Sequence, residues 1–142
     1  MRRDESGAAV SKSCSVLVVE DDPGVRELLR HVLTDEGNDV EVARDGQEMR
    51  AALDGRAFNA VIIDVRLPGA ENGIALARQA EEQGCAVVLI TGDHNHSEAL
   101  ARTGYPYLLK PFRVERLLEV TEDAVGAVSA PCRIRRRRDR TT

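Results

Sequence analysis

The chain has 142 residues, of which 42% are hydrophobic, 31% are charged and only 3% are aromatic. This length and composition are typical of one globular domain with an aliphatic core. No apolar run approaches the roughly 18 residues that a membrane span requires, and no apolar segment follows the first arginines as it would in a signal peptide. We therefore expect a cytoplasmic protein that has no membrane partner.

The net charge of −4 is unevenly distributed along the chain. Residues 131–142 contain six Arg and one Asp, whereas the rest of the chain is acidic. A basic tail can bind nucleic acid, but this one has no interleaved aromatic residues, so binding to nucleic acid is the less favoured interpretation. We expect a flexible amino-terminus over residues 1–13, a folded domain over 14–128 and a disordered basic tail over 129–142.

The three cysteines, Cys14, Cys85 and Cys132, lie far apart and form no CxxC pair. An odd number of cysteines without metal-ligand spacing favours a reducing compartment over a disulfide framework or a zinc site. We expect Cys14 and Cys85 to be small core residues near the starts of strands. Cys132 falls in the basic tail.

Short apolar runs alternate with helical patterns along the chain. Continuous apolar runs predict buried parallel strands, and the alternation at Val40 and Val42 predicts a half-exposed edge strand. Apolar residues at helical spacing predict the helices between the strands. In chain order, the predicted strands are 15–19, 40–42, 60–64, 86–90 and 105–109, and the predicted helices are 23–36, 47–53, 73–83, 97–102 and 114–128.

Strands that alternate with helices in this way predict an α/β protein, in which a doubly wound parallel sheet of five strands has helices on both faces. Ligands of such sheets bind at the carboxyl ends of the strands. In this chain, those ends carry three carboxylates, a hydroxyl and an ammonium: Glu20, Asp21, Asp64, Thr91 and Lys110. We therefore expect these five side chains to meet at one edge of the sheet.

The residue types at this edge indicate phosphoryl chemistry. Three clustered carboxylates repel one another unless a cation lies between them, and hard oxygen ligands suit Mg²⁺. The Lys110 ammonium, together with a metal ion, can neutralise a transferred phosphoryl group. An aspartate such as Asp64 is a competent nucleophile for an acyl-phosphate intermediate.

Four segments in this order resemble the response regulator receiver domain of bacterial two-component signalling. The similarity extends from about residue 14 to residue 128 and implies a flavodoxin-like (βα)5 fold, with strand order 2-1-3-4-5, like that of the chemotaxis regulators. The segments are Val16–Pro23 (VLVVEDDP), Val61–Gly69 (VIIDVRLPG), Leu89–Gly92 (LITG) and Leu108–Phe112 (LLKPF).

This resemblance implies roles for the acidic residues. Asp64 corresponds to the phosphoacceptor, which would make the chain a phosphoprotein. Glu20 and Asp21 correspond to the acidic pair that binds Mg²⁺ or Mn²⁺ together with Asp64. The backbone carbonyl of Arg66 is implied as a further metal ligand.

The resemblance also implies the switch residues. Thr91 corresponds to the hydroxyl that moves toward the phosphoryl group, and Lys110 corresponds to the lysine that pairs with it. Tyr107 corresponds to the aromatic residue that turns inward on activation, and Gly92 leaves room for the phosphodonor. The bond between Lys110 and Pro111 is implied to be cis.

Two further positions correspond to places that tune the lifetime of the acyl phosphate in this family. Arg66 lies two residues after the phosphoacceptor, and Asp93 lies two residues after Thr91. An ion pair between them would shield the acyl phosphate from water. Thr91 and Lys110 are nineteen positions apart, fewer than the family pattern leads us to expect, so we predict a shortened fourth helix.

The favoured interpretation is a stand-alone receiver domain rather than an enzyme. A sensor histidine kinase or histidine phosphotransfer protein would phosphorylate it, and it would signal by contact with a downstream protein or act as a phosphate sink, as a monomer or weak homodimer. A phosphatase with an aspartyl nucleophile, resembling the haloacid dehalogenase family, is one alternative, but Arg66 stands where that family has a second acid. A nucleic-acid-binding regulator that acts through the Arg-rich tail is the other alternative.

Overall fold

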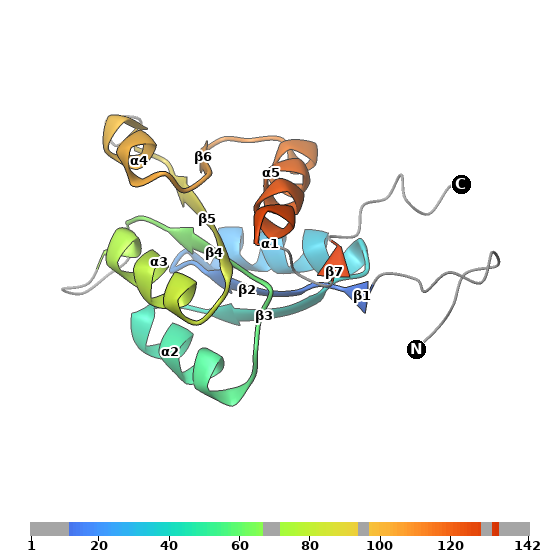
Figure 1. Cartoon of the computed structure of the whole chain (residues 1–142). Helices are drawn as coiled ribbons and strands as arrows, with labels where there is room; N and C mark the ends of the chain where they lie inside the picture. The colour runs from blue at the N-terminus through green and yellow to red at the C-terminus, as the bar shows by residue number, and fades with distance from the viewer. Residues whose placement is uncertain (1–11, 67–71, 94–96, 129–131, 134–142) are drawn as a thin grey trace.

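The computed structural model describes residues 12–66, 72–93, 97–128 and 132–133 (Figure 1). Its main feature is a five-stranded sheet in the order β3-β2-β4-β5-β6, in which every neighbouring pair is parallel. This is the predicted order 2-1-3-4-5, because the short β1 lies outside the main sheet. The strands are β2 Ser15–Val19, β3 Asp39–Ala43, β4 Ala60–Asp64, β5 Ala86–Thr91 and β6 Tyr107–Leu109.

Five helices connect these strands and cover both faces of the sheet (Figure 1). Three of them begin at a side chain that accepts backbone N–H groups of the first turn, a common helix-capping arrangement. These caps are Asp22, Asp45 and Asn72. The helices are α1 Pro23–Asp35, α2 Gly46–Gly55, α3 Gly73–Glu82, α4 Ser97–Thr103 and α5 Val114–Ala127. The expected short fourth helix has seven residues.

Alternate residues of each central strand belong to two separate apolar cores. On β2, Val16 and Val18 pack in the core that includes α1 and α5, whereas Leu17 and Val19 pack in the core that includes α2 and α3. All four side chains are fully buried. Burying one such aliphatic side chain contributes about 1.5–3 kcal/mol. These two cores therefore fix the position of each strand end, where the polar residues lie.

The last strand is shorter than predicted, because it begins at Tyr107 and leaves out Tyr105 and Pro106. Proline has no N–H group to donate to a sheet, and Gly104, just before Tyr105, has a positive φ of 81°. The Pro106 carbonyl still accepts a hydrogen bond from the Leu89 N–H at 3.0 Å. The turn at Gly104 and the proline therefore delay the start of regular pairing until Tyr107.

A second, two-stranded sheet joins the two ends of the described chain. β1 (Lys12–Ser13) pairs in parallel with β7 (Cys132–Arg133). The sequence did not predict this pair, since two-residue strands have no apolar pattern. Most of residues 1–13 and 129–142 lie outside the described part of the chain, so the expected flexibility of both ends stays a prediction.

The cysteines differ in part from expectation. Cys85 is free and buried, as predicted. Cys14 is also buried in the core, as predicted, but it is disulfide-bonded, which the preference for a reducing compartment over a disulfide framework did not anticipate. Over the described residues, no helix has both the length and the apolar character needed to cross a membrane.

Candidate functional site

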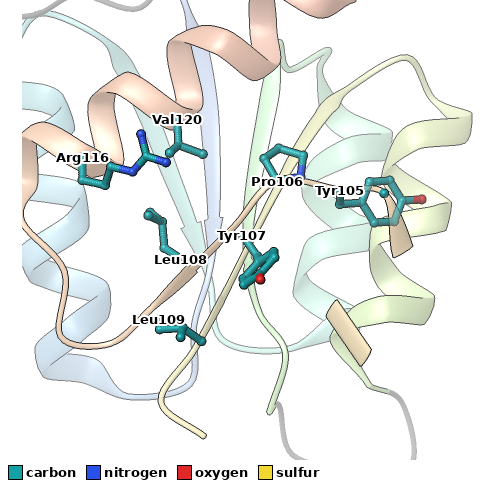
Figure 2. A pocket seen from close by; sticks show the side chains of 8 residues that line it. Tyr105, Pro106, Tyr107, Leu108, Leu109, Arg116 and Val120 are labelled. Carbon is teal, nitrogen blue, oxygen red and sulfur yellow. The ribbon is translucent and has the colours of Figure 1, made fainter. Parts of the chain in front are cut away.

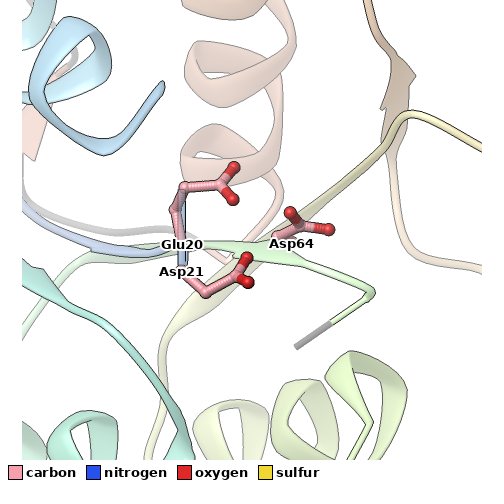
Figure 3. Close-up of side chains that lie close together, drawn as sticks. All are labelled: Glu20, Asp21 and Asp64. Carbon is pink, nitrogen blue, oxygen red and sulfur yellow. The ribbon is translucent and has the colours of Figure 1, made fainter. Parts of the chain in front are cut away.

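The acidic residues meet where β2 and β4 end side by side. Val19 is in register with Ile63, so the next residues of the two strands, Glu20 and Asp64, are neighbours at the carboxyl edge of the sheet. Oxygen atoms of Glu20, Asp21 and Asp64 all lie within 4.8 Å of one another (Figure 3). Glu20 and Asp64 are buried, whereas Asp21 is exposed. The predicted acidic cluster is therefore present and opens to solvent on the side of Asp21.

Lys110 reaches this cluster from the end of β6. Its Nζ donates hydrogen bonds to Glu20 Oε1 at 3.0 Å and to Asp64 Oδ2 at 3.2 Å. Its backbone N–H donates to the Thr91 carbonyl at 2.8 Å, which continues the pairing of β5 with β6. The peptide bond between Lys110 and Pro111 is cis, as the family resemblance implies. One ammonium group thus bridges the two buried carboxylates.

Burial and the charges of the cluster shift two pKa values, those of Glu20 and Lys110. Burial is the main cause that raises the pKa of Glu20 to about 7, and the hydrogen bond and charge of Asp64 raise it further, against the opposite effect of Lys110. Burial alone would lower the pKa of Lys110, but its hydrogen bonds and ion pairs with Glu20 and Asp64 outweigh burial and raise it. Lys110 is therefore charged at neutral pH, whereas Glu20 can gain or lose a proton there.

The donor set fits a hard divalent cation. Three carboxylates face one ammonium group, so the ionised cluster carries excess negative charge that a cation would neutralise. Mg²⁺ takes oxygen ligands and commonly binds one or two carboxylates, with waters and phosphate oxygens completing its shell. The exposure of Asp21 leaves one side of the cluster accessible to such ligands. Glu20, Asp21 and Asp64 are thus the residues that could hold Mg²⁺ or Mn²⁺.

Strand β5 extends one residue beyond its predicted end at Ile90. It therefore ends at Thr91, which lies beside the cluster. Thr91 is fully buried, and its hydroxyl oxygen accepts a hydrogen bond from the Asp93 N–H at 3.1 Å. Gly92 between them is exposed. A methyl group added at Gly92 would lie 3.7 Å from Lys110 Cδ, which is an ordinary van der Waals distance. Gly92 is therefore a solvent-exposed position that lies next to the aliphatic part of the Lys110 side chain.

Arg66 contacts the site through both its backbone and its side chain. Its backbone N–H donates to Asp64 Oδ1 at 2.9 Å, so the second carboxylate oxygen of Asp64 has a fixed partner. Its guanidinium lies 3.7 Å from Asp93 Oδ2. The Arg66 side chain is 64% exposed and that of Asp93 is 27% exposed. The ion pair expected from the sequence is therefore formed, across the mouth of the site.

Tyr107 lies apart from the acidic cluster, on β6. It is half-buried and packs against the core on the α2 and α3 side, whereas the neighbouring Leu108 points toward α5 (Figure 2). Both residues line a pocket of about 660 Å³ together with Arg116 and Val120 of α5 (Figure 2). Tyr107 is therefore placed between the core and an open surface pocket.

Sequence reasoning missed one residue that supports the site. Arg26 on α1 donates from Nη1 to the carbonyls of Glu20 at 3.1 Å and of Asp21 at 3.4 Å. Asp22 caps the same helix and donates its own N–H to Glu20 Oε2 at 3.3 Å. Together they attach the acidic segment to the first turn of α1. The available signal was the position of Arg26, one helical turn after Asp22.

Comparison with known proteins agrees with this geometry. The model of the response regulator receiver domain matches residues 16–122. The transcriptional regulatory protein TcrA of Mycobacterium tuberculosis is 35% identical over 106 residues, which cover 72% of this chain and 42% of that protein. The aerobic respiration control protein ArcA of Escherichia coli is 38% identical over 106 residues, which cover 72% of this chain and 44% of that protein. The chain thus spans less than half the length of either relative.

Solved structures show the same fold. A CheY-like receiver domain protein of Methanospirillum hungatei has a TM-score of 0.73 at 25% identity, covering 83% of this chain and 98% of that one. The receiver domain of NtrX from Brucella abortus has a TM-score of 0.71 at 34% identity, covering 78% of this chain and 98% of that one. With the extent of the family match and the CheY-like strand order, these likenesses show that the chain belongs to the response regulator receiver domain family.

Proposed function

We propose that this chain accepts a phosphoryl group on Asp64 from a sensor histidine kinase or a histidine phosphotransfer protein. The observation that carries the proposal is the meeting of Glu20, Asp21, Asp64 and Lys110 at one edge of the sheet. A nucleophilic carboxylate lies there beside groups that can bind a divalent cation and a phosphoryl group. The proposed setting is the cytoplasm, with the protein acting as a monomer or weak homodimer.

In the proposed reaction, an oxygen of Asp64 attacks the phosphorus of a phosphohistidine. The new P–O bond forms as the P–N bond breaks, and the histidine ring leaves with the bonding electron pair. Asp64 Oδ2 is the proposed nucleophile, because it lies beside the Lys110 ammonium, which can pair with the phosphoryl group, whereas Oδ1 accepts the Arg66 N–H. Lys110, which contacts Oδ2 in the unphosphorylated protein, then pairs with a phosphoryl oxygen.

Mg²⁺ or Mn²⁺, when bound, would neutralise negative charge on the phosphoryl group as the transfer proceeds. We propose that Glu20, Asp21, Asp64 and the backbone carbonyl of Arg66 hold the ion. Arg26 supports this arrangement, since it binds the carbonyls of both Glu20 and Asp21 and keeps their segment in place.

The proposed switch connects Asp64 to the pocket on β6. Thr91 would exchange its contact with the Asp93 N–H for one with the phosphoryl group. The space that Thr91 leaves would let Tyr107 turn inward and change the pocket shared with Leu108 and Arg116. A downstream protein would recognise that change by contact; alternatively, the domain drains phosphoryl groups from a shared kinase as a phosphate sink.

The proposal is tested by incubating the purified chain with Mg²⁺ and acetyl phosphate. We expect one phosphoryl adduct in the intact mass spectrum, which is lost on treatment with hydroxylamine and absent when Mg²⁺ is chelated. Asp64→Ala should abolish the adduct. Asp54→Ala, which changes an exposed aspartate on α2, should leave it unchanged and serves as the matched control.

Two results would contradict the proposal. An adduct that persists in Asp64→Ala would place the phosphoacceptor elsewhere. Sustained turnover of phosphate monoesters would instead support the aspartyl phosphatase. The alternative of nucleic-acid binding through the tail depends on residues 134–142, which lie outside the described part of the chain, and salt-dependent binding that is lost on deleting 131–142 would support it.

A further inference from the structure

Helix α3 contacts the segment that carries Asp64 at the first residue of the helix. The Gly73 N–H donates to the Val65 carbonyl at 3.0 Å. A Cβ atom added at Gly73 would lie 2.6 Å from Val65 Cα and 2.7 Å from the Asp64 carbonyl oxygen. The backbone of α3 is therefore packed directly against the backbone of Asp64 and Val65, and a shift of one requires a shift of the other.

The last turn of the same helix contacts the segment that leads into β6. The Tyr105 hydroxyl donates to Glu81 Oε1 at 2.8 Å, and the Tyr105 ring points away from α5 (Figure 2). Burial and this hydrogen bond raise the pKa of Tyr105 to about 12, so the phenol is protonated and can donate at neutral pH. Glu81 follows Gly73 on α3 at a distance of about 12 Å, given the helical rise of 1.5 Å per residue. One short helix thus contacts both segments.

Tyr105 also connects α3 to the pocket on β6. Its backbone N–H donates to Thr103 Oγ1 at 3.1 Å, and the Thr103 hydroxyl donates to the Leu100 carbonyl of α4 at 2.6 Å. Tyr105 and Tyr107 pack against the same core and line the same pocket. A movement of Tyr105 therefore alters both the pocket and the surroundings of Tyr107.

We propose that α3 couples Asp64 to the pocket on β6 through the hydrogen bond between Glu81 and Tyr105. This inference rests on the proposed phosphorylation of Asp64. In this scheme, phosphorylation shifts the backbone at Asp64, and α3 slides with it as a rigid unit. Shifts of packed helices by about 1–2 Å are a known element of switching transitions. The slide weakens the hydrogen bond between Glu81 and Tyr105 and releases the segment that precedes β6.

This connection is separate from the proposed route through Thr91. It requires neither the Thr91 hydroxyl nor an inward turn of Tyr107, because the force passes through the backbone contact at Gly73. The two routes meet only at the pocket on β6, which Tyr105 and Tyr107 both line. The contribution of α3 can therefore be measured when the Thr91 hydroxyl is absent.

The coupling must act in both directions. If a phosphoryl group on Asp64 weakens the contact between Glu81 and Tyr105, loss of that contact strengthens binding of a phosphoryl analogue by the same factor. Glu81 is exposed and Tyr105 is half-buried, so the contact is of the weaker kind. We expect a factor of about two to five.

The test measures the affinity of the full chain for beryllofluoride, a phosphoryl analogue, at a fixed Mg²⁺ concentration by fluorine NMR. Tyr105→Phe and Glu81→Ala should each bind about two- to fivefold more tightly than wild type, and the double variant should bind no more tightly than either. The gain from Tyr105→Phe should persist in a Thr91→Ala background. Glu82→Ala, which changes the next acidic residue of α3, should bind like wild type.

Three results would overturn the inference. Wild-type affinity in Tyr105→Phe, even with a lowered melting temperature, would make the contact merely structural. Additive gains in the double variant would show that Tyr105 and Glu81 do not act as a unit. Loss of the gain in the Thr91→Ala background would assign the coupling to the Thr91 route.

Failure of the proposed function has a different signature. Absence of beryllofluoride binding in wild type, or equal binding in Asp64→Ala, would contradict the role of Asp64 and with it the coupling. Binding that depends on Asp64 but is unaffected by Tyr105→Phe and Glu81→Ala would overturn the coupling alone.

Discussion

Lys110 Nζ lies 3.0 Å from Glu20 Oε1, although 90 positions separate the two residues in the sequence. Only the parallel order of the strands brings them together, since Glu20 follows β2 and Lys110 follows β6. The Glu20 side chain has no solvent exposure, and the Lys110 side chain is 24% exposed. The contact therefore combines a buried carboxyl group of raised pKa with an accessible ammonium group, and both affect how the site responds to pH.

Mg²⁺ binding should strengthen as the pH rises through about 7, where Glu20 loses its proton. The raised pKa favours the protonated carboxyl in the folded, metal-free protein; this contribution to stability is greatest below the ordinary value of 4.5 and is lost as the pH rises through about 7. A metal ligand must be deprotonated. We therefore expect about tenfold tighter binding at pH 8 than at pH 6, measured by calorimetry.

The control for this prediction is Glu20→Gln, which cannot ionise. Its Mg²⁺ affinity should be weaker than that of wild type and nearly independent of pH over the same interval. An equally steep pH dependence in Glu20→Gln would assign the proton to another group.

Gly73→Ala should destabilise the domain and disturb Asp64. A Cβ atom at Gly73 would lie 2.6 Å from Val65 Cα and 2.7 Å from the Asp64 carbonyl oxygen, which are backbone atoms that cannot rotate away. We expect a loss of about 1–3 kcal/mol in the free energy of unfolding, the usual cost of overpacking. Urea denaturation measures this loss, and the rate of phosphorylation by acetyl phosphate should also fall.

Gly126→Ala is the matched control, because it makes the same change in helix α5. Apart from its two chain neighbours and the backbone of its own helix, no atom lies within 4 Å of a Cβ added at Gly126. Alanine is favoured over glycine in helices by about 0.5–1 kcal/mol, so this variant should be equally or more stable than wild type. Wild-type stability in Gly73→Ala would show that the helix shifts to accept the methyl group.

Arg66→Ala should shorten the lifetime of the acyl phosphate on Asp64. The Arg66 guanidinium lies 3.7 Å from Asp93 Oδ2, and we predict that this pair limits access of water to the phosphoryl group. An exposed ion pair contributes only about 0–1 kcal/mol to stability, so the melting temperature should change little. The half-life is measured by following loss of the adduct by mass spectrometry after the phosphodonor is removed.

Asp93→Ala should have the same effect as Arg66→Ala if the pair acts as a unit, and the double variant should add nothing further. Arg102→Ala, which changes an exposed arginine on α4, serves as a control. If the half-life in Arg66→Ala equals that in wild type, the ion pair has no part in protecting the acyl phosphate.

Tyr105 should titrate at unusually high pH. Burial, followed by the hydrogen bond that its hydroxyl donates to Glu81 Oε1 at 2.8 Å, raises its pKa from 10.0 to about 12. The neutral phenol is thus favoured in the folded state, and this contribution to stability is complete below pH 10 and is lost as the pH rises through about 12. The ultraviolet absorbance of tyrosinate reports the titration.

The chain has two tyrosines, so the titration of Tyr105 is isolated in a Tyr107→Phe background. Replacing Glu81 by Gln in this background should move the midpoint toward the ordinary value, because the acceptor charge is removed. A midpoint near pH 10 before the Glu81 change would contradict the contact between the two side chains.

The sheet and its polar edge could be predicted from the sequence because both depend on local signals. Val61, Ile62 and Ile63 form an apolar run that requires cover on both faces, and the run ends at Asp64. Once parallel strands are inferred, geometry alone brings their carboxyl ends together. This is why the meeting of Asp64 with Glu20 was predictable.

Other features depend on contacts that no local pattern encodes. The β1–β7 pair requires segments from opposite ends of the chain to meet. The attachment of Arg26 to the carbonyl groups near Glu20 depends on how α1 packs, and arginine is common on any exposed helical face. Tyr105 was assigned to the last strand because its side chain suits a sheet, but the adjoining Pro106 prevents regular pairing.

The pairing of β1 with β7 has a consequence for the architecture of larger proteins. Because β1 and β7 pair, the polypeptide enters and leaves the described domain at one shared corner, on the side remote from Asp64. The corner that Lys12 and Cys132 share is thus a natural junction for building multidomain regulators.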